Sequence, residues 1–403
     1  MSSARLDLTR SVGSKPDPFP PWPDLDDEMV AAAAEVLRSG KINYWTGDEG
    51  QHFETEYAAA VGSEYAIAVA NGTVSLDLAM VALGVGPGDE VVVTPRSFIA
   101  SASCVLLRGA LPVFADVDRE SQNLTAETIE PVLTDRTKAI LLVHLAGWPC
   151  EMDSILDLAR DRGIAVIEDC AQAHGAMYRG RQAGSMGDIG SFSFCQDKIL
   201  TTGGEGGLVT TSSRDLWERM WAYKDHGKRA TESGENLNWS SAFKWVRESA
   251  GTNYRMTEMQ SAIGRVMLRR LPGWVEKRRT NAQMLNEAFA DVPGVRLTIP
   301  PDHIHHSYYK YYFFIKPESL KDDWFRDRII VEIMVRGVPC FAGSCPEIYL
   351  EKAFDGARPP ERLPVAQELG EVSIMLMVHP TLGEPEMERT IDAVRLVMDR
   401  AVR

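Results

Sequence analysis

Short apolar runs alternate with amphipathic segments through the first two thirds of the chain. Helical segments such as SLDLAMVALG and SFIASASCVLLRG separate the first of these runs. Near-continuous apolar strands separated by helices are typical of a parallel sheet covered on both faces. The pattern therefore predicts an α/β fold, with strands at 65–70 (YAIAVA), 89–95 (DEVVVTP), 111–117 (LPVFADV), 138–147 (KAILLVHLAG) and 164–171 (IAVIEDCA).

The pattern changes after about residue 270. YYKYYFFI at 308–315 predicts a new strand, and ERTIDAVRLVMDRAV at 388–402 predicts an amphipathic terminal helix. At the other end, the proline-rich segment that closes with SKPDPFPPWPDLD predicts an extended arm over the surface, followed by a helix at about 26–39. We expect an arm over 1–25, a large α/β domain over 26–279 and a smaller α+β domain over 280–403.

Composition and charge narrow the classes of partner. The formal net charge of −14 over 403 residues disfavours nucleic acid, because phosphate backbones are bound by an excess of Lys and Arg. No apolar run approaches the roughly 20 residues that cross a bilayer, and the N-terminal MSSARLDLTR lacks an apolar signal region. The six cysteines show no CxxC spacing, so neither a disulfide framework nor a zinc site is indicated. We expect a cytoplasmic protein that binds no nucleic acid, membrane or metal.

Residues at two strand ends are candidates for ligand binding. The strand at 164–171 runs into Asp169, and ligands of doubly wound folds lie at the carboxyl ends of strands. The same aspartate could instead cap a helix. ANGTVSLDLAM at 70–80 predicts a strand, a turn and a helix whose first N–H groups form an anion site, which Gly72 lets a phosphate approach closely. A plain capped turn is the alternative, since neither a Walker motif nor GxGxxG is present.

Lys198 stands in SFSFCQDKILTTGGEGG, after a strand-like run and before a glycine-rich turn. A lone lysine is usually a solvated surface charge. Here it accompanies a strand-end carboxylate and an anion-binding turn. Pyridoxal 5′-phosphate (PLP) needs an amine for a Schiff base, a carboxylate that keeps the pyridine nitrogen protonated, and a phosphate cradle. The three features together therefore indicate a PLP enzyme.

Several motifs resemble one known family. EDCAQAHGA, GDIGSFSFCQDKILTTGGEGG, GTNYRMTEMQSAIG, NGT and VHLAGWPCEMD stand in the order found in the DegT/DnrJ/EryC1/StrS aminotransferases. The resemblance covers about residues 20–400 and is clearest from 65 to 270. It implies a fold-type-I PLP enzyme, with a mainly parallel seven-stranded sheet in the large domain and a smaller C-terminal α+β domain.

The resemblance also implies roles for individual residues. Lys198 would form the Schiff base with PLP and then move a proton between the substrate Cα and the cofactor, with pyridoxamine 5′-phosphate as the intermediate form. Asp169 would pair with the pyridine nitrogen. The other implied cofactor contacts are Phe98 on the ring face, which could instead be a core residue, Gln172 near the phenolic oxygen, and Gly72, Thr73, Val74 and Ser193 at the phosphate. Asn253 would reach the phosphate from a neighbouring subunit, which implies a homodimer with shared active sites.

The family typically moves an amino group from L-glutamate or L-glutamine to a keto sugar, commonly linked to a nucleotide diphosphate, for cell-surface polysaccharides or antibiotics. A keto-cyclitol is an alternative acceptor. Some members are dehydratases with a histidine at the lysine position, so Lys198 favours transamination. Ile199 stands where an asparagine often follows the lysine, and TTGGEGG replaces the commoner TTGEGG, which bears on the shape of the loop.

Three further points stay open. The long aromatic segment 230–250, with Trp239, Phe243 and Trp245, is interpreted as a lid over the acceptor site or as an interface or packing insertion. His379 is expected to support the small domain or orient a substrate hydroxyl. Outside this enzyme class, a non-catalytic relative that kept the fold is one alternative, and an NAD-dependent Rossmann enzyme is disfavoured by its missing glycine fingerprint.

Overall fold

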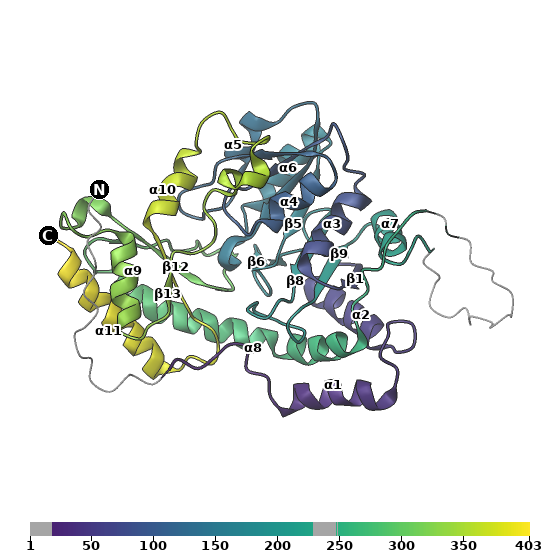
Figure 1. Cartoon of the computed structure of the whole chain (residues 1–403), viewed down its shortest axis with the longest axis horizontal. Helices are drawn as coiled ribbons and strands as arrows, with labels where there is room; N and C mark the ends of the chain where they lie inside the picture. Colours follow the sequence, from purple (N-terminus) through teal and green to yellow (C-terminus); the bar gives the residue numbers. More distant parts are fainter. Residues whose placement is uncertain (1–17, 229–246, 248) are drawn as a thin grey trace.

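The structure, a computed structural model, describes residues 18–228, 247 and 249–403 (Figure 1). Its main sheet has seven strands. In spatial order they are β1 (Tyr65–Val69), β9 (Gly207–Thr211), β8 (Ile189–Ser193), β5 (Ala165–Asp169), β4 (Thr137–Val143), β2 (Glu90–Val93) and β3 (Leu111–Phe114). All neighbours pair in parallel except β9, which is antiparallel to both β1 and β8 because the loop 194–206 returns the chain without a crossover helix. The mainly parallel sheet confirms the expected fold class.

Alternate side chains of the strands enter different cores on the two faces of this sheet. Ile67 and Val69 pack in one apolar cluster with helices α3, α4 and α6, whereas Ala66 and Ala68 pack in another with α2 and α8. Because both faces are buried, the central strands have near-continuous apolar sequences. The first seven helices are α1 (Asp27–Ser39), α2 (Glu49–Val61), α3 (Gly72–Ala82), α4 (Ala100–Leu107), α5 (Ala126–Ile129), α6 (Met152–Arg162) and α7 (Arg214–Lys224).

A second, antiparallel sheet of four strands lies at the other end of the molecule. Its order is β10 (Val295–Arg296), β12 (Tyr311–Ile315), β14 (Ser373–Leu376) and β13 (Cys340–Phe341), and the accompanying helices are α9 (Arg326–Val335), α10 (Pro364–Val372) and α11 (Glu384–Ala401). A small third sheet joins β11 (Ile304–His305), β6 (Met177–Tyr178) and β7 (Arg181–Gln182). The 3₁₀ turns are η1 (Glu130–Val132), η2 (Leu145–Gly147), η3 (Pro317–Ser319), η4 (Ile348–Leu350) and η5 (Lys352–Phe354).

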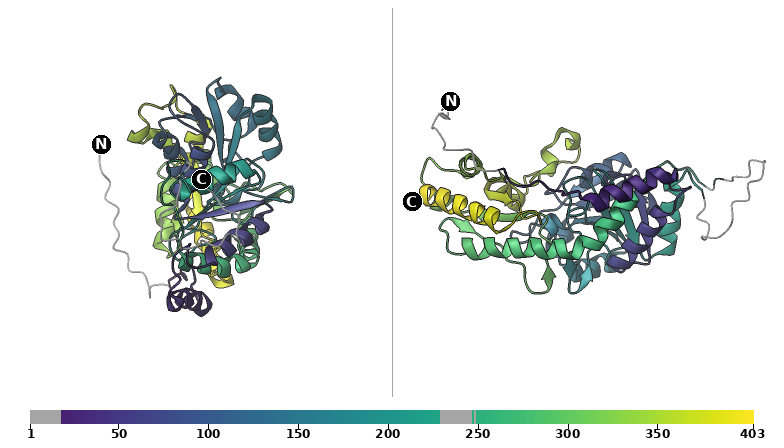
Figure 2. Two further views of the ribbon diagram at one scale, coloured as in Figure 1. Left: turned by 90° about the vertical axis from the view of Figure 1, so that its right-hand side faces the viewer. Right: turned by 90° about the horizontal axis from the view of Figure 1, so that it is seen from below.

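One long helix, α8 (Glu258–Phe289), runs beneath both parts of the molecule (Figure 1). It begins at a reciprocal cap, in which Thr257 accepts from the Gln260 N–H and Gln260 accepts from the Thr257 N–H. Figure 2 shows α11 lying beside its C-terminal part. The boundary at 279/280 therefore falls inside α8, and the division into a large and a small domain stays a proposal, supported by a separate apolar cluster built mainly from residues 282–401.

Two expectations concern the segments around these elements. The described part of the N-terminal arm, from residue 18, has neither helix nor strand before α1. The proposed lid lies almost wholly outside the described residues.

None of the described helices is both long enough and apolar enough to cross a membrane, and the six cysteines are free thiols.

Candidate active site

A cavity of about 1170 Å³ opens where the carboxyl ends of β4, β5 and β8 face the four-stranded sheet. It brings together eight of the nine residues that the resemblance assigns to the cofactor: Gly72, Thr73, Val74, Phe98, Asp169, Gln172, Ser193 and Lys198. The ninth, Asn253, is not among the lining residues; it is exposed and bridges to the Asp225 backbone. Residues from distant segments thus converge at one edge of the sheet, as expected for a doubly wound fold.

Asp169 is the last residue of β5 and lies buried at the wall of the cavity. The Ser101 hydroxyl donates to its Oδ2 (2.8 Å), and the Ala171 N–H donates to its Oδ1 (3.1 Å). Burial raises the pKa of the Asp169 carboxyl, and these hydrogen bonds and the nearby Lys198 offset only part of that effect. The site therefore holds an acidic group whose ionised form needs a cationic partner.

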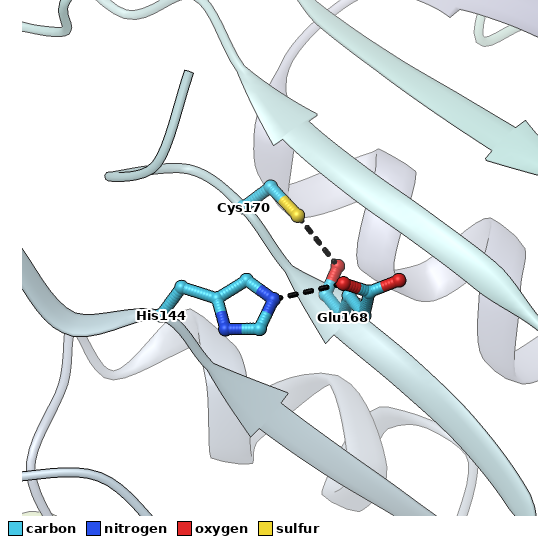
Figure 3. Close-up of side chains that lie close together, drawn as sticks. All are labelled: His144, Glu168 and Cys170. Atoms are coloured by element: carbon cyan, nitrogen blue, oxygen red, sulfur yellow. Dashed lines mark hydrogen bonds and ion pairs between the residues drawn. The ribbon is translucent and has the colours of Figure 1, made fainter. Parts of the chain in front are cut away.

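The residue before it, Glu168, belongs to a buried cluster with His144 and Cys170 (Figure 3). His144 donates to its carboxylate (2.9 Å), as do the N–H groups of Gly184 (2.9 Å), Met186 (2.7 Å) and Gly187 (2.7 Å). Burial opposes its charge, but these donors lower the pKa of the Glu168 carboxyl. Cys170 lies close enough to complete a three-residue metal-type cluster. Since four donors already occupy the Glu168 oxygens, we interpret the cluster as a support for the β5 end.

The turn between β1 and α3 also lines the cavity. The Asn71 side chain accepts from the Val74 N–H (3.0 Å), while the first N–H groups of any helix, here those of Gly72 and Thr73, have no partner within the helix. Side-chain space is absent at Gly72, where a Cβ would lie 2.5 Å from the Ser193 Cβ. Gly72 therefore lets the helix N-terminus and the β8 end meet, and the resulting cradle suits a phosphate.

Lys198 lies in the loop after β8, with its side chain 15% exposed. Its Nζ is 4.0 Å from Asp197 Oδ1 and 5.0 Å from the centre of the Tyr309 ring. The Tyr309 hydroxyl donates to Asp197, which also lies in the cavity wall. The surface-charge alternative is thus disfavoured, because most of the lysine is buried among other cavity residues.

Trp22 of the N-terminal arm supports this loop from behind. Its indole N–H donates to the backbone carbonyl of Lys198 (2.8 Å). The ring packs edge-on against Trp274 of α8 (5.2 Å between centroids) and stacks over His379 (6.2 Å). The arm, expected to cross the surface, therefore also fixes the backbone of the cavity lysine.

The remaining cavity candidates also have defined environments. Phe98 is 67% exposed, so it is not the core residue that was its alternative interpretation, and its ring is free to cover a bound group. The Gln172 side-chain oxygen accepts from the Ala146 N–H (2.8 Å), which fixes the amide at the wall. Ser193 is held through its carbonyl by His174 Nε2 (2.9 Å).

Sequence reasoning missed Ser101, Tyr309 and Lys310. Ser101 follows Phe98 by three residues. Its role is visible only in the structure, where its hydroxyl donates to the Asp169 carboxylate. Lys310 had a sequence signal, because it is the one charged residue within the aromatic run YYKYYFFI. His306 stacks on Tyr308, and Nδ1 of His379 lies 2.7 Å from the Thr381 hydroxyl oxygen. Neither histidine is among the residues that line the cavity.

Comparison with known proteins agrees with this geometry. A sequence model of the DegT/DnrJ/EryC1/StrS aminotransferase family matches residues 23–395. The chain is 35% identical over 378 residues to the dTDP-3-amino-3,4,6-trideoxy-alpha-D-glucose transaminase of Streptomyces venezuelae, an alignment that covers 93% of each protein. It is 36% identical over 392 residues to the GDP-perosamine synthase of Caulobacter vibrioides, covering 93% of this chain and 99% of that one.

Among solved structures, the aminotransferase from Psychrobacter cryohalolentis matches with a TM-score of 0.92 and 52% identity, over 95% of this chain and 99% of that one. This agreement over nearly full lengths confirms the fold-type-I architecture. The chain therefore belongs to the DegT/DnrJ/EryC1/StrS aminotransferase family and is a PLP-dependent aminotransferase.

Proposed function

We propose that this enzyme transfers the amino group of L-glutamate or L-glutamine to a keto sugar linked to a nucleotide diphosphate, in the biosynthesis of amino sugars. The observation that carries the proposal is the meeting of Lys198, Asp169 and the α3 N-terminus in one cavity. The names of the two relatives support sugar chemistry, one with a dTDP sugar and one with a GDP sugar. Because the two nucleotides differ, the names support nucleotide-linked sugars as the class of acceptor, and an experiment must identify the nucleotide.

The cavity residues fit PLP. We propose that Lys198 holds the cofactor covalently through Nζ and that Asp169 faces the pyridine nitrogen, whose positive charge would favour the ionised carboxylate. The Gly72 and Thr73 N–H groups, with Ser193, would hold the phosphate. Phe98 would cover the ring, and Gln172 would lie at its phenolic oxygen. When bound, PLP supplies an electron sink for the charge that develops at the substrate carbon.

The same residues provide the proton transfers. Lys198 Nζ would take the proton from the donor Cα in the first half-reaction and return one to the acceptor carbon in the second. A lysine in this place supports amino transfer rather than dehydration. The cavity of about 1170 Å³ exceeds the roughly 300–1,000 Å³ of most small-molecule sites, which leaves room for a cofactor and an extended acceptor.

We also propose a homodimer in which Asn253 reaches the cavity of the partner subunit. Its exposure, and its position outside the cavity lining of its own chain, support this role. Sedimentation of the purified protein at micromolar concentration should give twice the monomer mass, and a monomer that turns over at the full rate would contradict the proposal.

The experiment that tests the function follows the visible absorption of the PLP-loaded protein after each donor is added. L-glutamate or L-glutamine should bleach the yellow absorption of the lysine-bound cofactor, and a nucleotide-linked keto sugar should restore it with formation of an amino sugar detected by mass spectrometry. A spectrum that ignores both donors would contradict the donor class, and bleaching that only keto-cyclitols reverse would redirect the acceptor.

Gly72→Ala should weaken PLP binding about tenfold or more and lower stability by about 1–3 kcal/mol, because the new Cβ would meet the Ser193 Cβ at 2.5 Å. The measurements are PLP titration followed by absorption and thermal denaturation. Gly86→Ala is the matched control, since a Cβ there meets nothing within 4 Å. Equal PLP affinity in both variants would contradict the proposed cradle.

Trp22→Phe should lower stability by about 0.5–1.5 kcal/mol, because the Lys198 carbonyl loses its hydrogen-bond donor while an aromatic ring still faces Trp274. We expect a decrease of a few fold in kcat with little change in KM for the donor. Denaturation and steady-state kinetics measure the two effects. A variant with the wild-type kcat would show that the arm does not position the lysine.

A further inference from the structure

The cavity contains a second lysine that the proposed reaction does not use. Lys310 lies one residue before β12, lines the cavity and is 9% exposed. Burying an ammonium group is unfavourable unless an anion or several acceptors compensate it. A lysine at this depth therefore indicates either a partner within the protein or one that arrives with a ligand.

The structure offers Lys310 only weak partners. Its Nζ is 3.5 Å from Met377 Sδ and 4.6 Å from the centre of the Tyr309 ring. Among the described residues, no carboxylate lies within ion-pair distance of its Nζ. Asp197, the carboxylate whose charge raises the pKa of Lys310, already accepts a hydrogen bond from Tyr309 and lies 4.0 Å from the Lys198 Nζ. Met377 and Tyr309 themselves line the cavity, so the ammonium group lies at the wall that a ligand would contact.

Lys310 and the lysine proposed to react line the same cavity and face the same aromatic ring. Both ammonium groups sit over the same Tyr309 ring, with Lys198 at 5.0 Å and Lys310 at 4.6 Å from its centre. The amine of a donor has to reach the position of the Lys198 Nζ. The carboxylate of an α-amino acid is attached to the same carbon as that amine, so it would come within reach of a cation nearby.

We propose that Lys310 forms an anion subsite that binds an acidic group of the substrate, in the first place the carboxylate of the amino donor. The inference rests on the proposed function for the identity of the donor, but the subsite itself requires only the cavity. The phosphoryl groups of a nucleotide-linked acceptor offer the same chemistry, and the experiment separates the two sources. A charge-assisted hydrogen bond to a buried ammonium is the strong kind, because little water competes with it.

The affinity of the Lys310 subsite for an anion should depend on pH. Burial lowers the pKa of Lys310 to about 8, with Arg278 and Lys198 acting in the same direction and Asp197 opposing them. The ammonium form binds the anion, so affinity should be retained below about pH 8 and fall as the pH rises through this value. Arginine at the same position stays protonated and should move this fall to higher pH.

The test uses the PLP-loaded wild-type protein and three PLP-loaded variants: Lys310→Met, Lys310→Arg and the exposed-surface control Lys316→Met. Calorimetry measures the Kd of glutarate, a dicarboxylate without an amine, and separately the Kd of pyrophosphate. Glutarate binding does not require transamination, so the subsite can be tested even if no donor bleaches the cofactor. Rapid-mixing absorption then gives the apparent Kd of L-glutamate and the limiting rate of the first half-reaction.

Lys310→Met should raise the Kd of glutarate and the apparent Kd of L-glutamate by about ten- to hundredfold, with a much smaller change in the limiting rate. Lys310→Arg should recover most of the affinity, and the control should match wild type. A loss confined to pyrophosphate would assign the subsite to the acceptor. Unchanged affinity for both anions in Lys310→Met, with PLP still bound, would overturn the proposal.

Discussion

Lys198→Ala will abolish turnover and remove the absorption band of the Schiff base between the lysine and PLP. The loss of proton transfer alone is expected to slow the reaction by about 10²–10⁴-fold, and the loss of the covalent attachment adds to it. The side chain lies in a loop at the cavity wall and makes no hydrogen bond through Nζ to a described residue beyond its 4.0 Å approach to Asp197. Absorption and amino-sugar formation measure the effect, and the fold should persist.

Two controls keep this result interpretable. Circular dichroism and thermal denaturation of Lys198→Ala should match wild type without PLP. Lys316→Ala removes an exposed lysine and should retain full activity. Wild-type turnover in Lys198→Ala would refute the role of this lysine directly.

Asp169→Asn will slow turnover by about a hundred- to thousandfold, because the variant lacks the negative charge that stabilises a protonated pyridine nitrogen. Without PLP, the same substitution should not destabilise the folded protein. Burial raises the pKa of Asp169 in the folded chain, so its ionised form destabilises that state at neutral pH. The penalty declines as the pH falls below the raised pKa and is gone below the ordinary value of 3.8, where both states are protonated. The amide removes the buried charge, so Tm without PLP should equal or exceed that of wild type at pH 7–8.

The effects of Asp169→Asn on kcat and on Tm together distinguish a functional carboxylate from a structural one. If Asp169 only capped a helix, Asp169→Asn would leave both Tm and kcat nearly unchanged, because asparagine caps about as well as aspartate. We expect lower kcat, a smaller stabilisation by added PLP and undiminished Tm in its absence. Thermal denaturation with and without PLP, together with steady-state kinetics, measures all three.

The sequence predicted the sheet and its edge well for physical reasons. Strands buried on both faces must be apolar throughout, so β4 and β5 could be located from their short apolar runs alone. Polar residues at their ends, such as Asp169, then mark the edge where parallel strands meet. Gly72 was identifiable because a glycine at a helix N-terminus lets a phosphate approach the backbone closely. Its tight packing against Ser193 is seen only in the structure.

The contacts that complete the site depend on packing between distant segments. Trp22 and Lys198 are 176 positions apart, and Tyr309 and Asp197 are 112 apart, so no local pattern joins them. The two-residue strands β6, β7 and β11 are too short to carry a period-2 signal. The continuous helix α8 was also unexpected, because the sequence changes character along it while the helix continues past Pro272.

The central claim is that Lys198 is the lysine that carries the cofactor, and the cavity contains Lys310 as an internal alternative. The most direct test is borohydride reduction of the PLP-loaded protein, followed by proteolysis and mass spectrometry of the peptides. We expect a single pyridoxyl adduct on Lys198, lost in Lys198→Ala and retained in Lys310→Met. An adduct on Lys310, or none in a protein that still transfers amino groups, would contradict it.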